Sequence, residues 1–329
     1  MLRSAELWAH FLSLTDPDPK TSALFSAKVI PGRDADYIAK GVRGEPIVLL
    51  RVTEPHMTRP PLRLRYISVE YAQECRVKEE GISPVVGEFV MVTCVPDNPA
   101  LFELFVRSAD ALVSTIPTKP TVTQIEGCVR SFVELYRKLS QPSSRSIKGL
   151  WAELFLIDTS TAPIDLVSAW HVDATEKFDF SSGDTHIEVK ASELPQRVHE
   201  FALGQLRPAP GSHAYLASML LQRSAGGVGV LDLGERIAAK LGMNRQLISK
   251  VWDNIAQSLG SDFGVATDIK FDEHHAFSGL RMVPIEAIPC VQTPLAPEIL
   301  DVRIKVDVSA IADMHRVSRE RVEAMLTAS

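Results

Sequence analysis

The chain has 329 residues, of which 45% are hydrophobic and 23% charged, and its formal net charge at pH 7 is −6. This composition excludes a disordered chain, and the length favours two domains with a substantial core. A negative net charge is unlike that of a free-standing DNA-binding protein. No apolar run approaches the roughly 20 residues that cross a bilayer, so we expect a cytoplasmic protein with no membrane contact.

The cysteines are scattered along the chain and form no CxxC pair. They are Cys75, Cys94, Cys128 and Cys290. This spacing favours reduced, buried thiols over a disulfide framework. His186 and His199 are not spaced as zinc ligands either.

The first part of the chain is predicted to be rich in β-strands. An amphipathic helix opens it, and branched or apolar runs separated by Pro and Gly turns predict strands over 47–52, 62–69 and 89–95. Residues 28–78 carry 10 basic and 6 acidic side chains. This segment either grips phosphate or docks a partner, or it is simply a solvated strand face; the sequence leaves both open.

Helical patterns follow. Apolar spacing predicts helices starting at residue 99 and covering 122–139, and a short polar linker at 141–146 precedes a helix over 146–158 that contains Glu153. Because the pattern changes at the prolines of 117–120, we place the domain boundary near residue 120. This predicts a β-rich accessory domain over 1–120 and an α/β domain over 121–329.

The segment KFDFSSGDTHIEVKASE at 177–193 is the most informative part of the sequence, because Asp179 stands nine residues before Glu188 and Lys190 follows closely. Its alternation predicts a hairpin: a short strand around Asp179, a turn over 181–184, and a second strand from Ile187. Glu188 and Lys190 then project from the same face.

These residue types suit phosphodiester hydrolysis. The reaction needs a nucleophilic water near pH 7 and a positive charge for the leaving oxygen, and a divalent ion bound by hard oxygens supplies both. Asp179, Glu188 and the Val189 carbonyl are the candidate ligands for Mg²⁺ or Mn²⁺. Lys190 would orient the water or steady the phosphate.

With these residues the chain resembles the PD-(D/E)XK superfamily of restriction-endonuclease-like nucleases, although Phe178 replaces the motif proline. The resemblance implies an acidic catalytic residue on the preceding helix, Glu153, and a glutamine after the motif strand, Gln205. The order of GLWAEL, Trp170, FDF, IEVKAS and GQL is similar to a bacterial branch encoded beside restriction and phage-defence genes.

The resemblance also implies the architecture and biology. We expect a restriction-endonuclease-like core, a central mixed β-sheet flanked by helices, with a helical insertion and C-terminal helices. We expect a metal-dependent deoxyribonuclease that acts on DNA, has protein partners in a restriction or anti-phage defence system and is compatible with a homodimer. The chain has no P-loop or methyltransferase motif of its own.

Other interpretations of the same residues stay open. Glu188 and Lys190 also suit a charge pair on a solvated strand, and Asp184 is a rival metal ligand, although an Asp in such a turn usually bonds its own backbone. The chain could be a catalytically silent DNA- or protein-binding scaffold. The helices over 233–241 and 245–259 superficially resemble a helix-turn-helix, with Arg245 and Gln246 opening the second helix.

Downstream elements complete the prediction. We expect a buried strand over 213–221, a turn at 225–227, a strand over 302–308 and two helices within 309–326.

Overall fold

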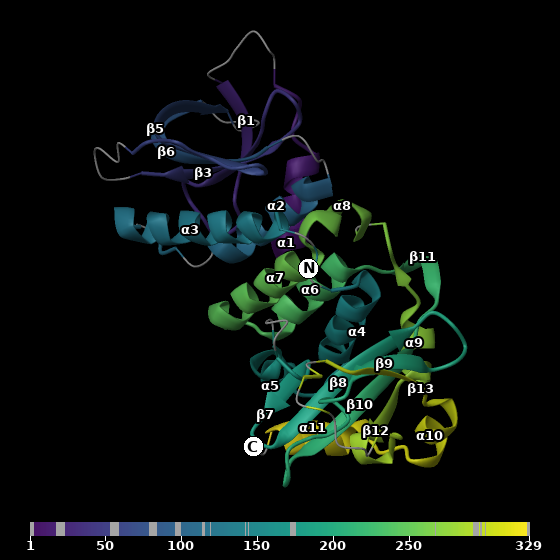
Figure 1. Ribbon diagram of the computed structural model, residues 1–329. Coiled ribbons are helices and arrows are strands. Elements are labelled where there is room, and N and C mark those ends of the chain that lie inside the picture. The colour runs from purple at the N-terminus through teal and green to yellow at the C-terminus, as the bar shows by residue number, and fades with distance from the viewer. Residues whose placement is uncertain are drawn as a thin grey trace. The chain divides into compact units, whose positions relative to one another are not determined.

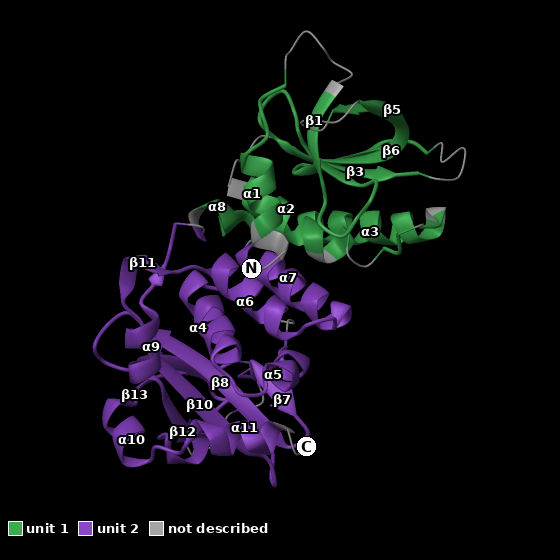
Figure 2. Cartoon of the chain, turned by 180° about the vertical axis from the view of Figure 1, so that it is seen from behind, with its two compact units in different colours: residues 1–142, 260–264 green, residues 143–259, 265–329 purple. Residues whose placement is uncertain are grey.

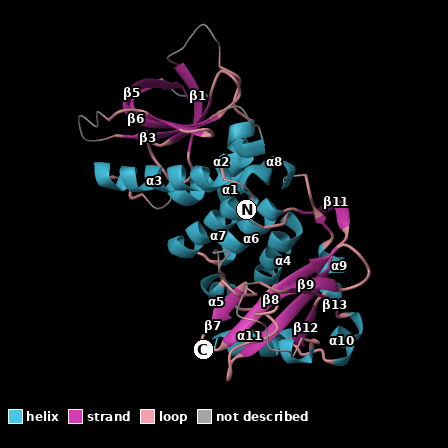
Figure 3. Cartoon of the chain, in the orientation of Figure 1, coloured by secondary structure: helices cyan, strands magenta, loops and turns pink. Residues whose placement is uncertain are grey.

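The computed structural model describes residues 3–17, 24–52, 59–78, 84–95, 100–113, 116–118, 120–141, 143, 145–171, 176–266, 268–291, 296, 298–299 and 301–327. The fold is mixed α/β, as predicted (Figure 3). It divides into two compact units, Met1–Pro142 with Gly260–Gly264, and Ser143–Leu259 with Val265–Ser329 (Figure 2).

Unit 1 is a small β-barrel with helices (Figure 1). Its elements are α1 (Arg3–Leu12), β1 (Leu24–Val29), β2 (Tyr37–Lys40), β3 (Pro46–Arg51), β4 (Leu62–Arg63), β5 (Ile67–Lys78), β6 (Val85–Cys94), α2 (Ala100–Val113) and α3 (Val122–Leu139). The sheet order is β1-β2-β3-β6-β5-β4, and β1 also pairs in parallel with β5. This second pairing closes the sheet, so that β1 presents no free edge.

The long strand β5 pairs with β4 near its start and with β1 at its end, and it is irregular between these two regions. Its register with β6 shifts between Glu70 and Gln73, and Ala72 has a positive φ of 53°. A bulge of this kind bends a strand and increases its twist. Tyr37 and Phe89 meet edge-on in the barrel core, with ring centroids 6.0 Å apart.

The strands predicted at 47–52 and 89–95 correspond to β3 and the second half of β6. The prediction of one strand over 62–69 is wrong, because β4 and β5 form an antiparallel pair in which Leu62 faces Val69. The division between units falls after Pro142 rather than near residue 120. α3 belongs to unit 1 because Phe132 and Tyr136 pack against Phe105 of α2, with ring centroids 5.5 and 5.9 Å apart.

Unit 2 contains a mixed four-stranded sheet and a separate two-stranded ribbon. Its main elements are α4 (Ile147–Asp158), α5 (Pro163–Ala169), β7 (Phe180–Ser182), β8 (Thr185–Ser192), β9 (Val198–Ala202), β10 (His213–Leu220), β11 (Arg223–Val228), α6 (Val230–Lys240), α7 (Arg245–Leu259), α9 (Glu273–Gly279), β12 (Arg281–Pro284), β13 (Arg303–Asp307), α10 (Ser309–Met314) and α11 (Arg319–Thr327). A short α8 (Phe263–Ala266) lies where the units divide.

The sheet order is β12-β10-β8-β7, with β8 and β10 parallel and the outer pairs antiparallel. Leu216 of β10 is the register partner of Glu188 and therefore shares its face of the sheet. Leu216 belongs to a core cluster with Phe201 of β9, Val308 and Ala312. The β9–β13 ribbon therefore covers the face of the sheet from which Glu188 and Lys190 project.

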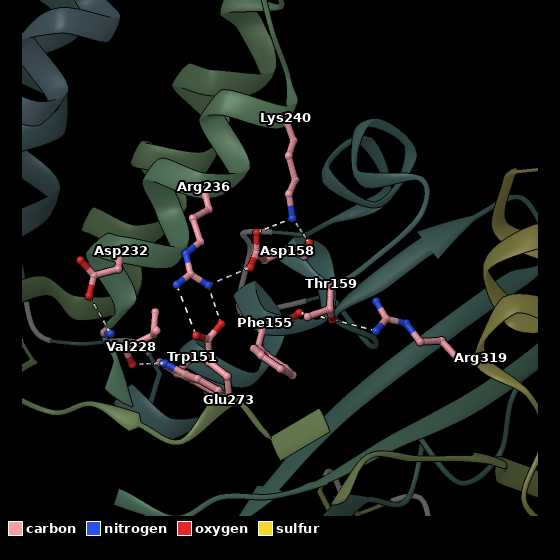
Figure 4. Close-up of polar contacts among 11 residues, drawn as sticks. Trp151, Phe155, Asp158, Thr159, Val228, Asp232, Arg236, Lys240, Glu273 and Arg319 are labelled. Carbon is pink, nitrogen blue, oxygen red and sulfur yellow. Dashed lines mark hydrogen bonds and ion pairs between the residues drawn. The ribbon is translucent and has the colours of Figure 1, made fainter. Parts of the chain in front are cut away.

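Charged contacts fix α4 at its C-terminal end (Figure 4). Asp158, which is buried, lies 2.6 Å from the Lys240 amine and 3.6 Å from the Arg236 guanidinium, both on α6. Arg319 of α11 donates to the Thr159 hydroxyl at 2.7 Å, and the Trp151 indole donates to the Val228 carbonyl at 2.7 Å. These contacts set the position of the helix that carries Glu153.

Several predicted elements differ in detail. The predicted turn at 225–227 is wrong, because these residues lie within β11, which bridges to Phe271. The predicted helix pairs are present as α6 with α7 and as α10 with α11. Lys250 of α7 donates to the Ser168 carbonyl at 2.8 Å.

Candidate active site

The motif segment forms a tight hairpin. β7 and β8 pair from Phe180 with Ile187 to Ser182 with Thr185, so Gly183 and Asp184 make a two-residue turn, and Gly183 has the positive φ of 51° that such turns require. Ser181 and Ser182 are therefore strand rather than turn, and Asp179 lies just before β7 instead of within it. The exposed Asp184 remains in the turn, away from the buried Glu188.

Asp179 is held beside β8 by its side chain and its backbone. Its Oδ2 accepts a hydrogen bond of 2.8 Å from the Val189 N–H, and its carbonyl accepts one of 2.9 Å from the His171 N–H. These bonds bring the motif aspartate next to the strand that carries Glu188.

Glu188 and Lys190 share a face and touch. The Lys190 amine lies 2.6 Å from Glu188 Oε1 and 5.7 Å from the ring centroid of Phe201. The Glu188 side chain is only 4% exposed, and its Oε2 is buried without a hydrogen-bond partner among the described residues. A buried carboxylate oxygen in that state is available to a cation.

Glu153 lies on α4 and is also buried. Its Oε2 accepts a hydrogen bond of 2.7 Å from the Trp170 indole and forms an ion pair with Arg145. The Arg145 guanidinium also donates to the His171 carbonyl at 3.0 Å and lies 3.7 Å from Asp179 Oδ1. Arg145, which sequence reasoning did not select, thus connects Glu153 to Asp179.

The carboxylates perturb one another. Burial and the neighbouring Asp179 raise the pKa of Glu153 and of Glu188, while Arg145 opposes the rise at Glu153 and Lys190 opposes it at Glu188. Burial also raises the pKa of Asp179, while Arg145 and the Val189 N–H oppose that rise. Burial disfavours the charge of Arg145, but Glu153 and Asp179 outweigh it and raise its pKa. Gathered acidic groups of this kind favour binding of a further cation.

Gln205 is not joined to these residues in the structure. Its amide oxygen accepts from the Ala202 N–H at 3.0 Å and its amide nitrogen donates to the Lys177 carbonyl at 3.1 Å. Both ends of the side chain therefore hold the turn after β9 against the segment that leads to Asp179.

The donor chemistry fits a divalent metal, because Asp179 and Glu188 offer the hard oxygens that Mg²⁺ and Mn²⁺ bind. Within the part of the chain that the structure describes, no group of three or more His, Cys, Asp or Glu side chains is placed to hold a metal ion. A metal here would therefore need Asp179, Glu188 and a further ligand such as the predicted Val189 carbonyl.

A pocket of about 400 Å³ lies elsewhere in unit 2 and contains none of these residues. It is lined by Phe277, Leu280, Met282, Arg316, Val317, Ser318, Arg319 and Glu320. No helix among the described residues has the length and apolar character needed to span a membrane.

Comparison with known proteins gives one family. Residues 17–309 match the family model DUF4420, described as "Putative PD-(D/E)XK family member". No curated protein and no solved structure gives a significant match. The family match covers most of both units and includes the five predicted catalytic positions.

Proposed function

This chain belongs to the PD-(D/E)XK family DUF4420, and from that premise we propose that it is a metal-dependent endonuclease that hydrolyses DNA phosphodiester bonds. One observation carries the proposal: the Val189 N–H holds Asp179 beside β8, where the Lys190 amine lies 2.6 Å from Glu188. An acidic pair with an adjacent ammonium is the arrangement that this reaction needs.

Each side chain has a role in the proposal. Asp179, Glu188 and the Val189 carbonyl would hold Mg²⁺ or Mn²⁺, which supplies positive charge to make a water nucleophilic at neutral pH and to neutralise the phosphate. Lys190 donates to the attacking water or to a phosphate oxygen as charge develops. Glu153 fixes Trp170 and Arg145 behind the acidic pair.

The restriction-endonuclease-like core and the biological role belong to the same proposal. The mixed sheet, with α4 packed against β8, supports the core. The similarity of the motif order to a branch encoded beside defence genes supports a role in restriction or anti-phage defence. Partner proteins would then choose the target, since the chain carries no P-loop or methyltransferase motif.

The test is nicking of supercoiled plasmid with Mg²⁺ or Mn²⁺. We expect Asp179→Asn and Lys190→Ala each to lower the rate by about 10³-fold while circular dichroism shows the fold intact. Asp179→Asn removes a charged ligand of the proposed metal ion, and Lys190→Ala removes the ammonium that acts on the water or the phosphate. Lys305→Ala, at an exposed lysine of β13, is the matched control. Equal nicking by wild type and Lys190→Ala would refute the assignment.

A catalytically silent scaffold is the second candidate. One observation favours it: two side chains of the protein itself, Lys190 and Arg145, form ion pairs with the site carboxylates Glu188 and Glu153. A scaffold would bind DNA or its partner protein equally well as wild type and as Asp179→Asn, and neither form would nick DNA in the assembled complex.

A further inference from the structure

Arg145 lies among the candidate active-site residues but is not part of the sequence motif. Resting on the proposed function, we propose that Arg145 is a resident cation that holds Glu153 and Asp179 in the metal-free site, and that a divalent ion displaces its guanidinium from Asp179 but not from Glu153. Arg145 is therefore a positioning residue that sets the metal affinity of the site.

The contacts of Arg145 are unequal. Its guanidinium pairs closely with Glu153 and donates to the His171 carbonyl at 3.0 Å, whereas its contact with Asp179 Oδ1 is 3.7 Å. Asp179 Oδ2 is already engaged by the Val189 N–H. A metal ion binding Asp179 through Oδ1 would therefore compete with the weakest of the three contacts and leave the other two intact.

The backbone fixes where this side chain can reach. Arg145 precedes Ser146, the N-cap of α4, whose hydroxyl accepts from the Gly149 N–H at 3.2 Å. The Arg145 N–H donates to the Ser258 carbonyl at 3.4 Å. From this fixed point just outside the helix the side chain reaches forward to Glu153.

The site carboxylates are largely buried, so their negative charge needs a neighbouring positive charge. The side chains of Glu153 and Glu188 are 5% and 4% exposed, and those of Arg145 and Asp179 are each 17% exposed. Uncompensated charge in such surroundings is costly. Lys190 forms an ion pair with Glu188, whereas Arg145 is the cation that pairs with both Glu153 and Asp179. A guanidinium stays charged at every relevant pH, so Arg145 compensates these carboxylates whatever their surroundings.

The experiment compares wild type, Arg145→Gln and Arg145→Lys by calorimetric titration with Mn²⁺ and by thermal unfolding in EDTA or Mn²⁺. Arg145→Gln should unfold at least about 5 °C lower in EDTA, because Glu153 and Asp179 lose the cation that compensates their buried charge. It should bind Mn²⁺ about tenfold more tightly, because the competing cation is gone. Mn²⁺ should raise its Tm more than that of wild type.

Two variants keep the result interpretable. Arg145→Lys retains the charge and should stay near wild type in Tm and Mn²⁺ affinity. Arg223→Gln removes an exposed arginine that pairs with Glu193 at 2.7 Å, and should change neither quantity.

The outcomes separate this inference from the proposed function. If wild type binds Mn²⁺ and nicks DNA but Arg145→Gln has unchanged or weaker affinity, the resident-cation role is refuted and the nuclease proposal stands. If only Arg145→Gln binds Mn²⁺, the role is supported in its strongest form. If neither protein binds Mn²⁺, both proposals fail.

Discussion

The Gln205 side chain is hydrogen-bonded to backbone groups at both of its ends. Its amide bonds the Ala202 N–H and the Lys177 carbonyl, so it ties the turn after β9 to the segment two residues before Asp179. The resemblance predicts a catalytic glutamine here, whereas these contacts favour a positioning role.

Gln205→Ala separates the two roles. We expect it to lower the free energy of unfolding by about 1–2 kcal/mol, because two hydrogen bonds are lost and the Ala202 N–H loses its acceptor. Plasmid nicking should fall by less than about tenfold, far less than for Lys190→Ala. A loss of nicking equal to that of Lys190→Ala, with unchanged stability, would instead place Gln205 at the scissile phosphate.

His199 gives unit 2 a pH-dependent stability. The ring is buried on β9, where Nε2 lies 2.8 Å from the Ser218 hydroxyl and Arg197 donates to the same serine. Burial, with Lys190, Arg197 and Lys148 nearby, lowers the pKa of His199 from 6.5 to about 4, and only Asp307 opposes this. The folded protein therefore keeps the imidazole neutral.

The sign of the effect follows from that shift. Below pH 6.5, His199 becomes protonated in the unfolded chain but stays neutral in the folded protein. Its contribution to the free energy of unfolding is therefore complete above pH 6.5 and is lost as the pH falls from 6.5 to about 4. The loss should be about 3 kcal/mol. Urea unfolding of wild type and His199→Gln across this range measures the loss. The free energy of unfolding of wild type should fall relative to that of His199→Gln as the pH falls. A constant difference would mean that His199 is not buried as a neutral ring.

Local periodicity predicts the helices well. α3 and α7 begin and end where their apolar spacing does, and Ser146 caps α4 as its position suggests. β9 was not predicted, although it covers the motif face, because its packing surface comes from β10 and from residues near 308–312. Strand pairing between distant segments leaves no local pattern.

The site shows the same limit. Asp179, Glu188 and Lys190 can be predicted because their types and order match a motif, and Glu153 because the resemblance implies an acidic residue on the preceding helix. Arg145 carries no such signal, since its partners are found only after α4 and the segment before β7 come together.

Gly227 lies in β11, where the sequence pattern predicts a turn. Its backbone comes close to the backbone of Phe271. A methyl group at Gly227 would lie 2.3 Å from the Phe271 carbonyl oxygen, whereas one at the adjacent Gly226 would meet nothing within 4 Å. We expect Gly227→Ala to lower the free energy of unfolding by about 1–3 kcal/mol, because backbone must move. Gly226→Ala, the matched control, should change it by less than about 0.5 kcal/mol. Equal effects in urea unfolding would contradict the β11–Phe271 contact.

The sequence predicts two domains but does not indicate how the chain is divided between the two compact units. Gly260–Gly264 returns to unit 1 after most of unit 2 is complete. The barrel closes through a parallel pairing of β1 with β5, which brings Leu24 opposite Arg76. Neither feature is encoded in a contiguous segment, so neither could be read from periodicity.

Because the net charge is −6, the proposed contact with DNA would have to come from particular basic residues. Four exposed basic side chains lie along β4, β5 and the turn between them, namely Arg63, Arg65, Arg76 and Lys78. The Arg63 side chain is 76% exposed although it lies 3.9 Å from Glu70, and Arg65 is exposed beside the Tyr66 ring, so both guanidinium groups are accessible from solvent.

Replacing both Arg63 and Arg65 by Glu tests whether these residues contact DNA phosphates. Each lost phosphate contact should lower the salt dependence of DNA binding by about one unit of slope, so the double variant should bind more weakly and show a slope reduced by about two. Arg137→Glu is the matched control, because Arg137 is exposed on α3 of the same unit and pairs with Glu134 at 3.3 Å. Fluorescence anisotropy over a range of salt concentrations gives both quantities. If the double variant and the control behave alike, the basic residues of β4 and β5 are a solvated strand face, and DNA contact must come from unit 2 or from a partner.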